Sequence, residues 1–160
     1  MHWMILPLKR YADFAGRSRR MEYWMFAVMN FVISMVLAGP AAFAYFAAIA
    51  AVDPTAAGSE AEMAEALMGG IGTLGWAGLS LYGLYFLAVL IPSIAVVVRR
   101  LHDRDMSGWW YLGFIVASLL PFVGILASIG FIVLMFLPGT DGPNRFGPDP
   151  KDPSNTEVFE

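Results

Sequence analysis

The residues best able to do chemistry lie in one short charged block, residues 99–108. His102 is followed directly by Asp103, with Asp105 two residues further on. A histidine beside carboxylates can serve as a general base, a proton relay or a metal ligand. A metal site needs three or four converging ligands, and the other histidine, His2, lies at the far N-terminal end. The chain has no cysteine, which excludes thiol catalysis and cysteine metal sites. From these observations together we expect no catalytic residue, metal or cofactor.

The same block is also suited to a membrane surface. Arg99 and Arg100 begin it and Trp109 and Trp110 follow it, an order that sets cations at the headgroups and indole rings at the water–hydrocarbon boundary. Each basic residue near an anionic surface contributes about 1 kcal/mol. We therefore favour anchoring, with His102 and Asp103 joined by a fixed hydrogen bond, over ligand binding, and place catalysis last.

Composition points to an all-α, polytopic transmembrane helical bundle. Hydrophobic residues make up 58% of the chain, mean hydropathy is +0.62, and the charges avoid three long apolar runs. We place spans at about 23–52, 71–98 and 109–137 within a transmembrane domain, 23–137. An interfacial segment, 1–22, precedes it; an outer loop, 53–70, and a second loop, 99–108, join the spans; a Pro/Gly-rich polar tail, 138–160, follows.

The third run has two possible topologies, because Pro121-Phe122-Val123-Gly124 divides it. A single span kinked at Pro121 would leave the tail outside. Two short helices would instead form a re-entrant hairpin and return the tail to the inside, provided that protein covers the buried backbone of the turn. We favour the single kinked span.

The distribution of charge sets the orientation. Five of the ten basic residues precede the first span and three lie in segment 99–108, whereas loop 53–70 has none and carries four acidic residues. The positive-inside rule then predicts a cytoplasmic N-terminus with segment 1–22, a cytoplasmic loop 99–108 and an outer loop 53–70.

Small residues indicate how the first two spans pack. Gly69, Gly72, Gly75 and Gly78 recur every third residue at the start of the second span, and the end of the first span is rich in alanine. Small side chains let helix backbones approach closely in lipid. We expect these two stretches to face each other, and a ligand passage between them is much the rarer alternative.

Two further polar segments flank the spans. In the first, Arg17 and Arg20 precede Glu22, a carboxylate unusually close to the hydrocarbon. We expect it either to pair with an arginine, local or in the 99–104 block, or to stay solvated in the first helical turn. In the second, the prolines and glycines around Asn144 and Arg145 impose turns, so that the tail either docks on the membrane domain or is a disordered exit segment.

Three ordered motifs resemble one known family. They are Gly16-Arg17-Ser18-Arg19-Arg20-Met21-Glu22-Tyr23-Trp24, then Arg99-Arg100-Leu101-His102-Asp103 with Ser107-Gly108-Trp109-Trp110, and Pro138-Gly139-Thr140 with Gly142-Pro143-Asn144-Arg145-Phe146-Gly147. The chain is similar over about residues 8–150 to domain of unknown function 805 (DUF805). The resemblance implies a small, multi-pass bacterial inner-membrane protein with no assigned activity. The chain departs from the family at two places. Its outer loop is longer than that of most members, and it has Arg104-Asp105 where members commonly have Thr-Gly or Thr-Asp.

We expect a non-catalytic structural or regulatory module of the inner membrane. It would dock anionic lipid headgroups, or a membrane-protein partner or second copy, through its cytoplasmic-face residues, and would bind no nucleic acid. The candidate docking residues are Arg17, Arg20, Glu22, Arg99, Arg100, His102, Asp103, Trp109, Trp110, Asn144 and Arg145.

Two other function classes remain. The alternative is a small transporter or channel subunit acting as an oligomer, although the apolar runs lack the charges that ion-coupled carriers use. Such a pore would depend on polar residues such as Asn30, Ser34, Thr73 or Ser80. An enzyme at the headgroup plane would use His102, Asp103 and the arginines, but no nucleophile–base or phosphate-loop pattern accompanies them.

Overall fold

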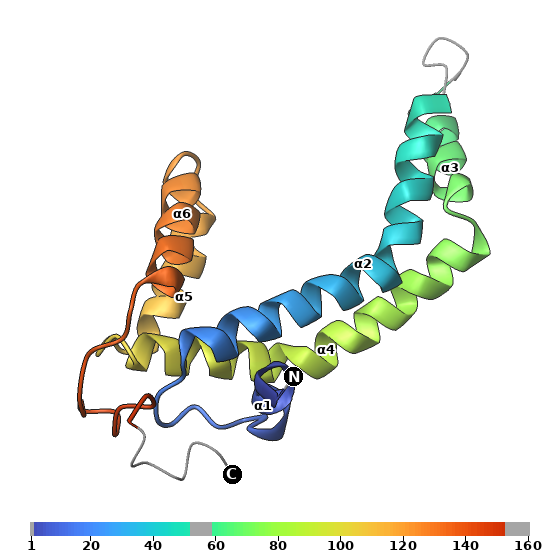
Figure 1. Cartoon of the computed structure of the whole chain (residues 1–160). Coiled ribbons are helices and arrows are strands. Elements are labelled where there is room, and N and C mark those ends of the chain that lie inside the picture. The colour runs from blue at the N-terminus through green and yellow to red at the C-terminus, as the bar shows by residue number, and fades with distance from the viewer. Residues whose placement is uncertain (1, 52–58, 153–160) are drawn as a thin grey trace. The chain divides into compact units, whose positions relative to one another are not determined.

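The computed structural model describes residues 2–51 and 59–152, and the regular structure of these residues is helical (Figure 1). The described residues fall into two compact units, one of 2–27 with 89–152 and one of 28–51 with 59–88. The helices in chain order are α1 (His2–Lys9), α2 (Arg20–Ala51), α3 (Glu60–Gly70), α4 (Gly72–His102), α5 (Trp109–Ser118) and α6 (Val123–Phe136). An all-α fold is therefore confirmed.

Two helices are long and apolar enough to cross a membrane. Of the described helices, α2 has 32 residues and α4 has 31. At about 1.5 Å per residue each exceeds the roughly 30 Å hydrocarbon layer, so helices occupy the first two predicted spans. The basic residues Arg99, Arg100 and His102 occupy the last turn of α4, where the negative end of the helix dipole favours cations.

The end of α4 is closed by Asp105, which has a φ of 57° in the left-handed region. The Met106 amide donates to the Leu101 carbonyl at 3.0 Å and the Asp105 amide to the His102 carbonyl at 2.9 Å. These bonds cap the final carbonyls as in a Schellman motif, which usually has glycine at this place. Aspartate tolerates the conformation better than most residues, which explains how Asp105 can occupy it.

The third apolar run forms two helices, so the favoured single kinked span was wrong. α5 and α6 pack against each other as a hairpin (Figure 1). Their 10 and 14 residues correspond to about 15 and 21 Å, and each is too short to cross alone. The turn depends on Phe122, with a φ of 61°, and on Gly124, where an added Cβ would lie 2.5 Å from the Ser118 carbonyl oxygen.

The hairpin turn satisfies most of its own backbone donors. The amides of Leu119 and Leu120 donate to carbonyls three residues back at 3.2 Å, and the Gly124 amide donates to the Leu120 carbonyl at 2.8 Å. Pro121 has no N–H to satisfy. Since hydrocarbon cannot hydrogen-bond exposed backbone, this turn suits an apolar surrounding, and large apolar side chains such as Phe122 are exposed on it.

In the unit of residues 28–88, glycines allow α4 to approach α2 closely. A Cβ at Gly78 would lie 2.4 Å from the Leu37 carbonyl oxygen, and one at Gly75 would lie 3.2 Å from the Ala41 Cα. The predicted glycine–alanine packing is confirmed at Gly75, whereas Gly78 packs against the main chain of Leu37, before the alanine-rich stretch.

The other two glycines of the repeat do not make such contacts. An added Cβ at Gly69 or Gly72 would meet nothing within 4 Å, and Gly72, with a φ of 67°, instead forms the turn into α4. Gly70 takes their place, since its Cβ would lie 2.6 Å from the Ala48 Cβ.

Polar side chains in this unit bond within it. The Tyr85 hydroxyl donates to the Asn30 side-chain oxygen at 2.6 Å. The hydroxyls of Ser34 and Ser80 donate to carbonyls four residues back on their own helices, at 2.7 and 2.9 Å. Three of the residues that a pore could use are therefore engaged within the unit.

Gly78→Ala should destabilise the protein by about 1–3 kcal/mol, because a backbone carbonyl occupies the space of the new methyl group. Gly83→Ala is the matched control, since its Cβ would meet nothing within 4 Å, and alanine should be neutral or stabilising there. Thermal unfolding of both variants in detergent checks this. Equal midpoints for the two variants would contradict the close approach.

Candidate functional site

Six polar or charged side chains are buried around the end of α4. They come from the segment before α2, from the first turn of α2, and from the last turn of α4 and the residue after it. None is more than 6% exposed. This arginine–carboxylate cluster consists of Arg17, Ser18, Glu22, Arg99, Arg100 and Asp103.

Three ion pairs organise the cluster. Arg99 pairs with Glu22 at 2.9 Å, and Asp103 accepts from Arg17 at 2.9 Å through one oxygen and from Arg100 through the other. Glu22 is only 2% exposed, so its predicted pairing with an arginine of the 99–104 block is confirmed and the solvated alternative is wrong.

The buried arginines outnumber the carboxylates by three to two. Main-chain oxygens accept several of their other N–H groups, although the Nε atoms of Arg99 and Arg100 have no hydrogen-bond partner among the described residues. Arg17 donates to the carbonyls of Thr140 and Gly142, both at 2.6 Å. Arg99 donates to the Asp13 carbonyl at 2.5 Å. Burying an unpaired ion costs several kcal/mol, so these bonds are what makes an excess of buried cations tolerable.

Three arginines hold the C-terminal end of α6. Arg20 donates to the Phe136 carbonyl at 3.1 Å, Arg100 to that of Leu137 and Arg104 to that of Pro138. The last carbonyls of a helix lack intrahelical partners and carry the negative end of its dipole. The three arginines donate hydrogen bonds to these carbonyls and place positive charge at the negative end of the dipole, so they fix the C-terminal end of the hairpin.

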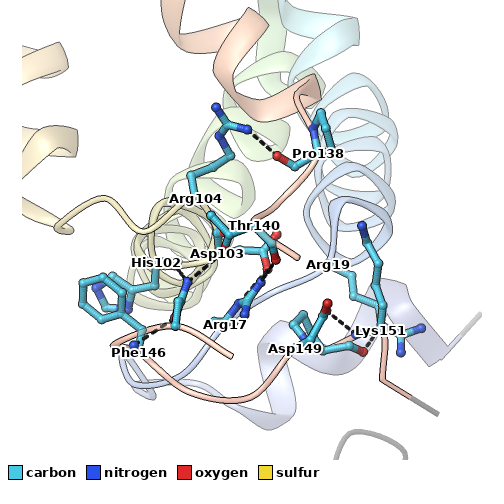
Figure 2. Close-up of polar contacts among 12 residues, drawn as sticks. Arg17, Arg19, His102, Asp103, Arg104, Pro138, Thr140, Phe146, Asp149 and Lys151 are labelled. Carbon is cyan, nitrogen blue, oxygen red and sulfur yellow. Dashed lines mark hydrogen bonds and ion pairs between the residues drawn. The ribbon is translucent and has the colours of Figure 1, made fainter. Parts of the chain in front are cut away.

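The tail docks on the end of α4, which confirms the predicted docking and excludes a disordered exit for residues 138–150. The Thr140 amide donates to the Asp103 carbonyl at 2.8 Å, and the Asn144 side chain donates to the His102 carbonyl at 2.9 Å. Figure 2 shows Arg17, Asp103 and Thr140 meeting at this point. At Gly139, an added Cβ would lie 2.0 Å from Asp103 Oδ2, so only glycine lets the tail approach this carboxylate.

The His102 ring contacts the segment before α2 and the docked tail. Its Nδ1 lies 3.2 Å from the Gly16 carbonyl oxygen, and its ring stacks on Phe146 with centroids 3.9 Å apart and planes 4° apart. The predicted His102–Asp103 hydrogen bond is wrong, because the Asp103 carboxylate is occupied by Arg17 and Arg100. In the described part of the chain, no three His, Asp or Glu side chains converge as metal ligands would.

The remaining predicted docking residues lie at the surface. The side chain of Arg145 is 60% exposed and pairs with Asp105 at 3.1 Å. Trp109 is 79% and Trp110 56% exposed, and Arg20 is exposed as well. We call Arg20, Trp109, Trp110 and Arg145 the rim.

Sequence reasoning missed Asp13, Ser18 and Gly139. Burial tends to raise the pKa of Asp13, but hydrogen bonds from Arg10 and the Ala15 amide, together with the nearby positive charges of Arg10 and Arg99, outweigh it and leave the pKa lowered. Ser18 and Gly139 carried a signal, since each stands inside one of the three motifs, whereas Asp13 lies outside them.

An apolar groove of about 560 Å³ opens beside the cluster. Its walls are α4 and α5, and Phe14 adds to it from the segment before α2. His102 and Ser107 also line it, so the groove adjoins the polar cluster at one end.

Asp103→Asn should destabilise the protein by about 3–5 kcal/mol, because it leaves two buried arginines without their shared carboxylate. Asp105→Asn is the matched control, since its exposed pair with Arg145 contributes about 0–1 kcal/mol and asparagine also tolerates a positive φ. Denaturation in detergent measures both. A smaller loss for Asp103→Asn than for Asp105→Asn would refute the central role of Asp103.

Residues near the two chain ends should lie on the same side of the membrane, because Arg17 binds the tail directly. The chain has no native cysteine, so Lys9→Cys and Lys151→Cys can be labelled singly in oriented vesicles with an impermeant maleimide. Both should react from the same side, whereas Glu65→Cys marks the predicted outer loop. Reaction of Lys9→Cys and Lys151→Cys from opposite sides would exclude the docked tail.

Known proteins match this chain over nearly its whole length. The profile of the family described as "Protein of unknown function (DUF805)" matches residues 11–148. The Escherichia coli inner membrane protein YhaH is 39% identical over 94% of this chain and 98% of its own length. Inner membrane protein YhaI of the same organism is 35% identical over 97% of this chain and 100% of its own length. No solved structure gives a significant match. The chain therefore belongs to the DUF805 family, as its three motifs indicated.

Proposed function

We propose that the protein is a non-catalytic structural or regulatory module of the bacterial inner membrane, crossing it more than once with its N-terminus in the cytoplasm. It docks anionic lipid headgroups or a membrane-protein partner through the rim. The inner-membrane relatives and the two long apolar helices support the location. The basic residues before α2 and after residue 98 support the orientation.

The observation that supports this proposal most directly is that most polar groups of the buried cluster bind the protein's own chain. Arg17, Arg99 and Arg100 each bond both a carboxylate and a main-chain carbonyl. Groups held in this way are poor candidates for nucleophile, base or phosphate clamp, because a reaction would have to displace structural partners. The cluster therefore acts as a scaffold.

What the scaffold presents to the outside is the rim. Trp and Arg are the side chains most enriched at sites that dominate binding energy, and Trp with basic residues also suits the headgroup layer. Trp109 and Trp110 begin α5, and Arg145 is exposed on the docked tail. The rim residues thus come from three separate stretches of the chain, at Arg20, at Trp109 and Trp110, and at Arg145.

A photoreactive benzoylphenylalanine at Trp110 in native membranes should give discrete protein or lipid adducts that mass spectrometry identifies. The same probe at Leu126, which is 71% exposed on α6, is the control and should give only diffuse lipid labelling. Adding Arg145→Gln should reduce the Trp110 adducts about fivefold, as expected for the loss of about 1 kcal/mol. Identical adduct patterns at Trp110 and Leu126 would refute docking through the rim.

A further inference from the structure

The groove beside the cluster has one polar end and one apolar end. His102 and Ser107 lie at the polar end, which we call the mouth. Beyond it, Val98 and Ile94 continue the α4 wall, and Leu112 and Ile115 continue the α5 wall. The groove's volume, about 560 Å³, falls in the range of about 300–1,000 Å³ that small-molecule sites occupy.

Both walls lead from the mouth into the apolar parts of their helices. At about 1.5 Å per residue, the eight residues from His102 back to Ile94 cover roughly 12 Å, and the six from Trp109 to Ile115 cover roughly 9 Å. The groove is therefore a slot that starts at the polar edge of the helices and runs a limited way along them.

The electrostatics of the mouth favour an anion. The described lining contains no carboxylate. The Arg145 guanidinium lies 4.8 Å from the centre of the Phe146 ring, which itself stacks on His102 at the mouth. Arg145 pairs with the Asp105 carboxylate through Nε and donates to the Asp105 carbonyl through Nη2 at 2.7 Å. Both side chains of the pair are about half exposed or more, so the ion pair is weak, and neither bond uses Nη1.

We infer that the groove binds one anionic phospholipid, with an acyl chain between α4 and α5 and the phosphate at the mouth near Arg145. An apolar slot with a single cationic end matches an amphiphile that has one charged head. A partner's transmembrane helix fits poorly, because a helix is about 10–12 Å across and spans about 30 Å, whereas the groove walls extend roughly 12 Å at most. The inference rests on the proposed headgroup-docking role of the rim. It adds the class of ligand, an anionic phospholipid, and the place where that ligand binds.

Native mass spectrometry of the full chain, released from vesicles of equal phosphatidylglycerol and phosphatidylcholine with matched chains, tests this inference. We expect one retained phospholipid, with phosphatidylglycerol favoured at least fivefold. Leu112→Trp fills the groove and should lower retention at least fivefold. Leu126→Trp is the matched control, because Leu126 is exposed on α6 and does not line the groove, and it should retain lipid as the wild type does.

The variants separate the groove from the rim. Arg145→Gln should keep the lipid but lose the preference for phosphatidylglycerol, because it removes the cation near the mouth. Full retention in Leu112→Trp, together with that loss of preference in Arg145→Gln, would overturn the groove and leave rim docking intact. Unchanged binding in both variants would overturn both proposals.

A second measurement needs no groove-filling variant. Phosphatidylglycerol with brominated chains should quench wild-type tryptophan fluorescence saturably and more strongly than brominated phosphatidylcholine, because Trp109 lines the groove. Trp109→Phe should remove the saturable part. Equal, non-saturating quenching by the two lipids would overturn the inference whether or not Leu112→Trp folds.

Discussion

The unit of residues 2–27 and 89–152 depends on the two ion pairs that the buried carboxylate of Asp103 makes. One oxygen binds Arg17, which in turn holds the tail through Thr140 and Gly142. The other oxygen binds Arg100, which reaches the end of α6. The same residue accepts the Thr140 amide through its main chain. A single side chain thus joins the N-terminal segment, α4, the hairpin and the tail.

Ion pairs of this kind explain which chain segments lie next to each other better than they explain how stable the fold is. A buried ion pair often contributes no more than well-packed apolar side chains would, whereas the loss of one partner is costly. Apolar contacts, such as those around Val97, Leu101 and Met135, are non-directional. Charge-assisted hydrogen bonds, in contrast, fix distance and angle. We interpret the cluster as the element that selects which segments meet, while the apolar contacts supply the burial.

The sequence predicted the features that depend on local pattern. Long uncharged runs predict α2 and α4. An isolated carboxylate among arginines makes pairing one of the two alternatives for Glu22, and the structure selects it. The hairpin was missed because run 109–137 has the length of one span, and a turn there requires the positive φ of Phe122 and the close approach of Gly124 to Ser118. The partner of His102 was missed for a similar reason, since Arg17 is 86 residues from Asp103 and takes the carboxylate that adjacency assigned to His102.

The short hairpin and the arginine–carboxylate cluster divide the polar residues into two sets, those bonded within the protein and those exposed at its edge. Because α5 and α6 fold back on each other as a hairpin, the tail comes back to the end of α4, and its carbonyls can satisfy arginines that would otherwise be buried without enough partners. Those arginines are then unavailable to an external ligand. The groups that the scaffold leaves exposed at its edge are the rim and the mouth of the groove, where a cation and indole rings stand beside an apolar slot. The proposed ligand, an anion attached to a hydrocarbon chain as in the headgroup layer, has the chemistry that matches such an edge.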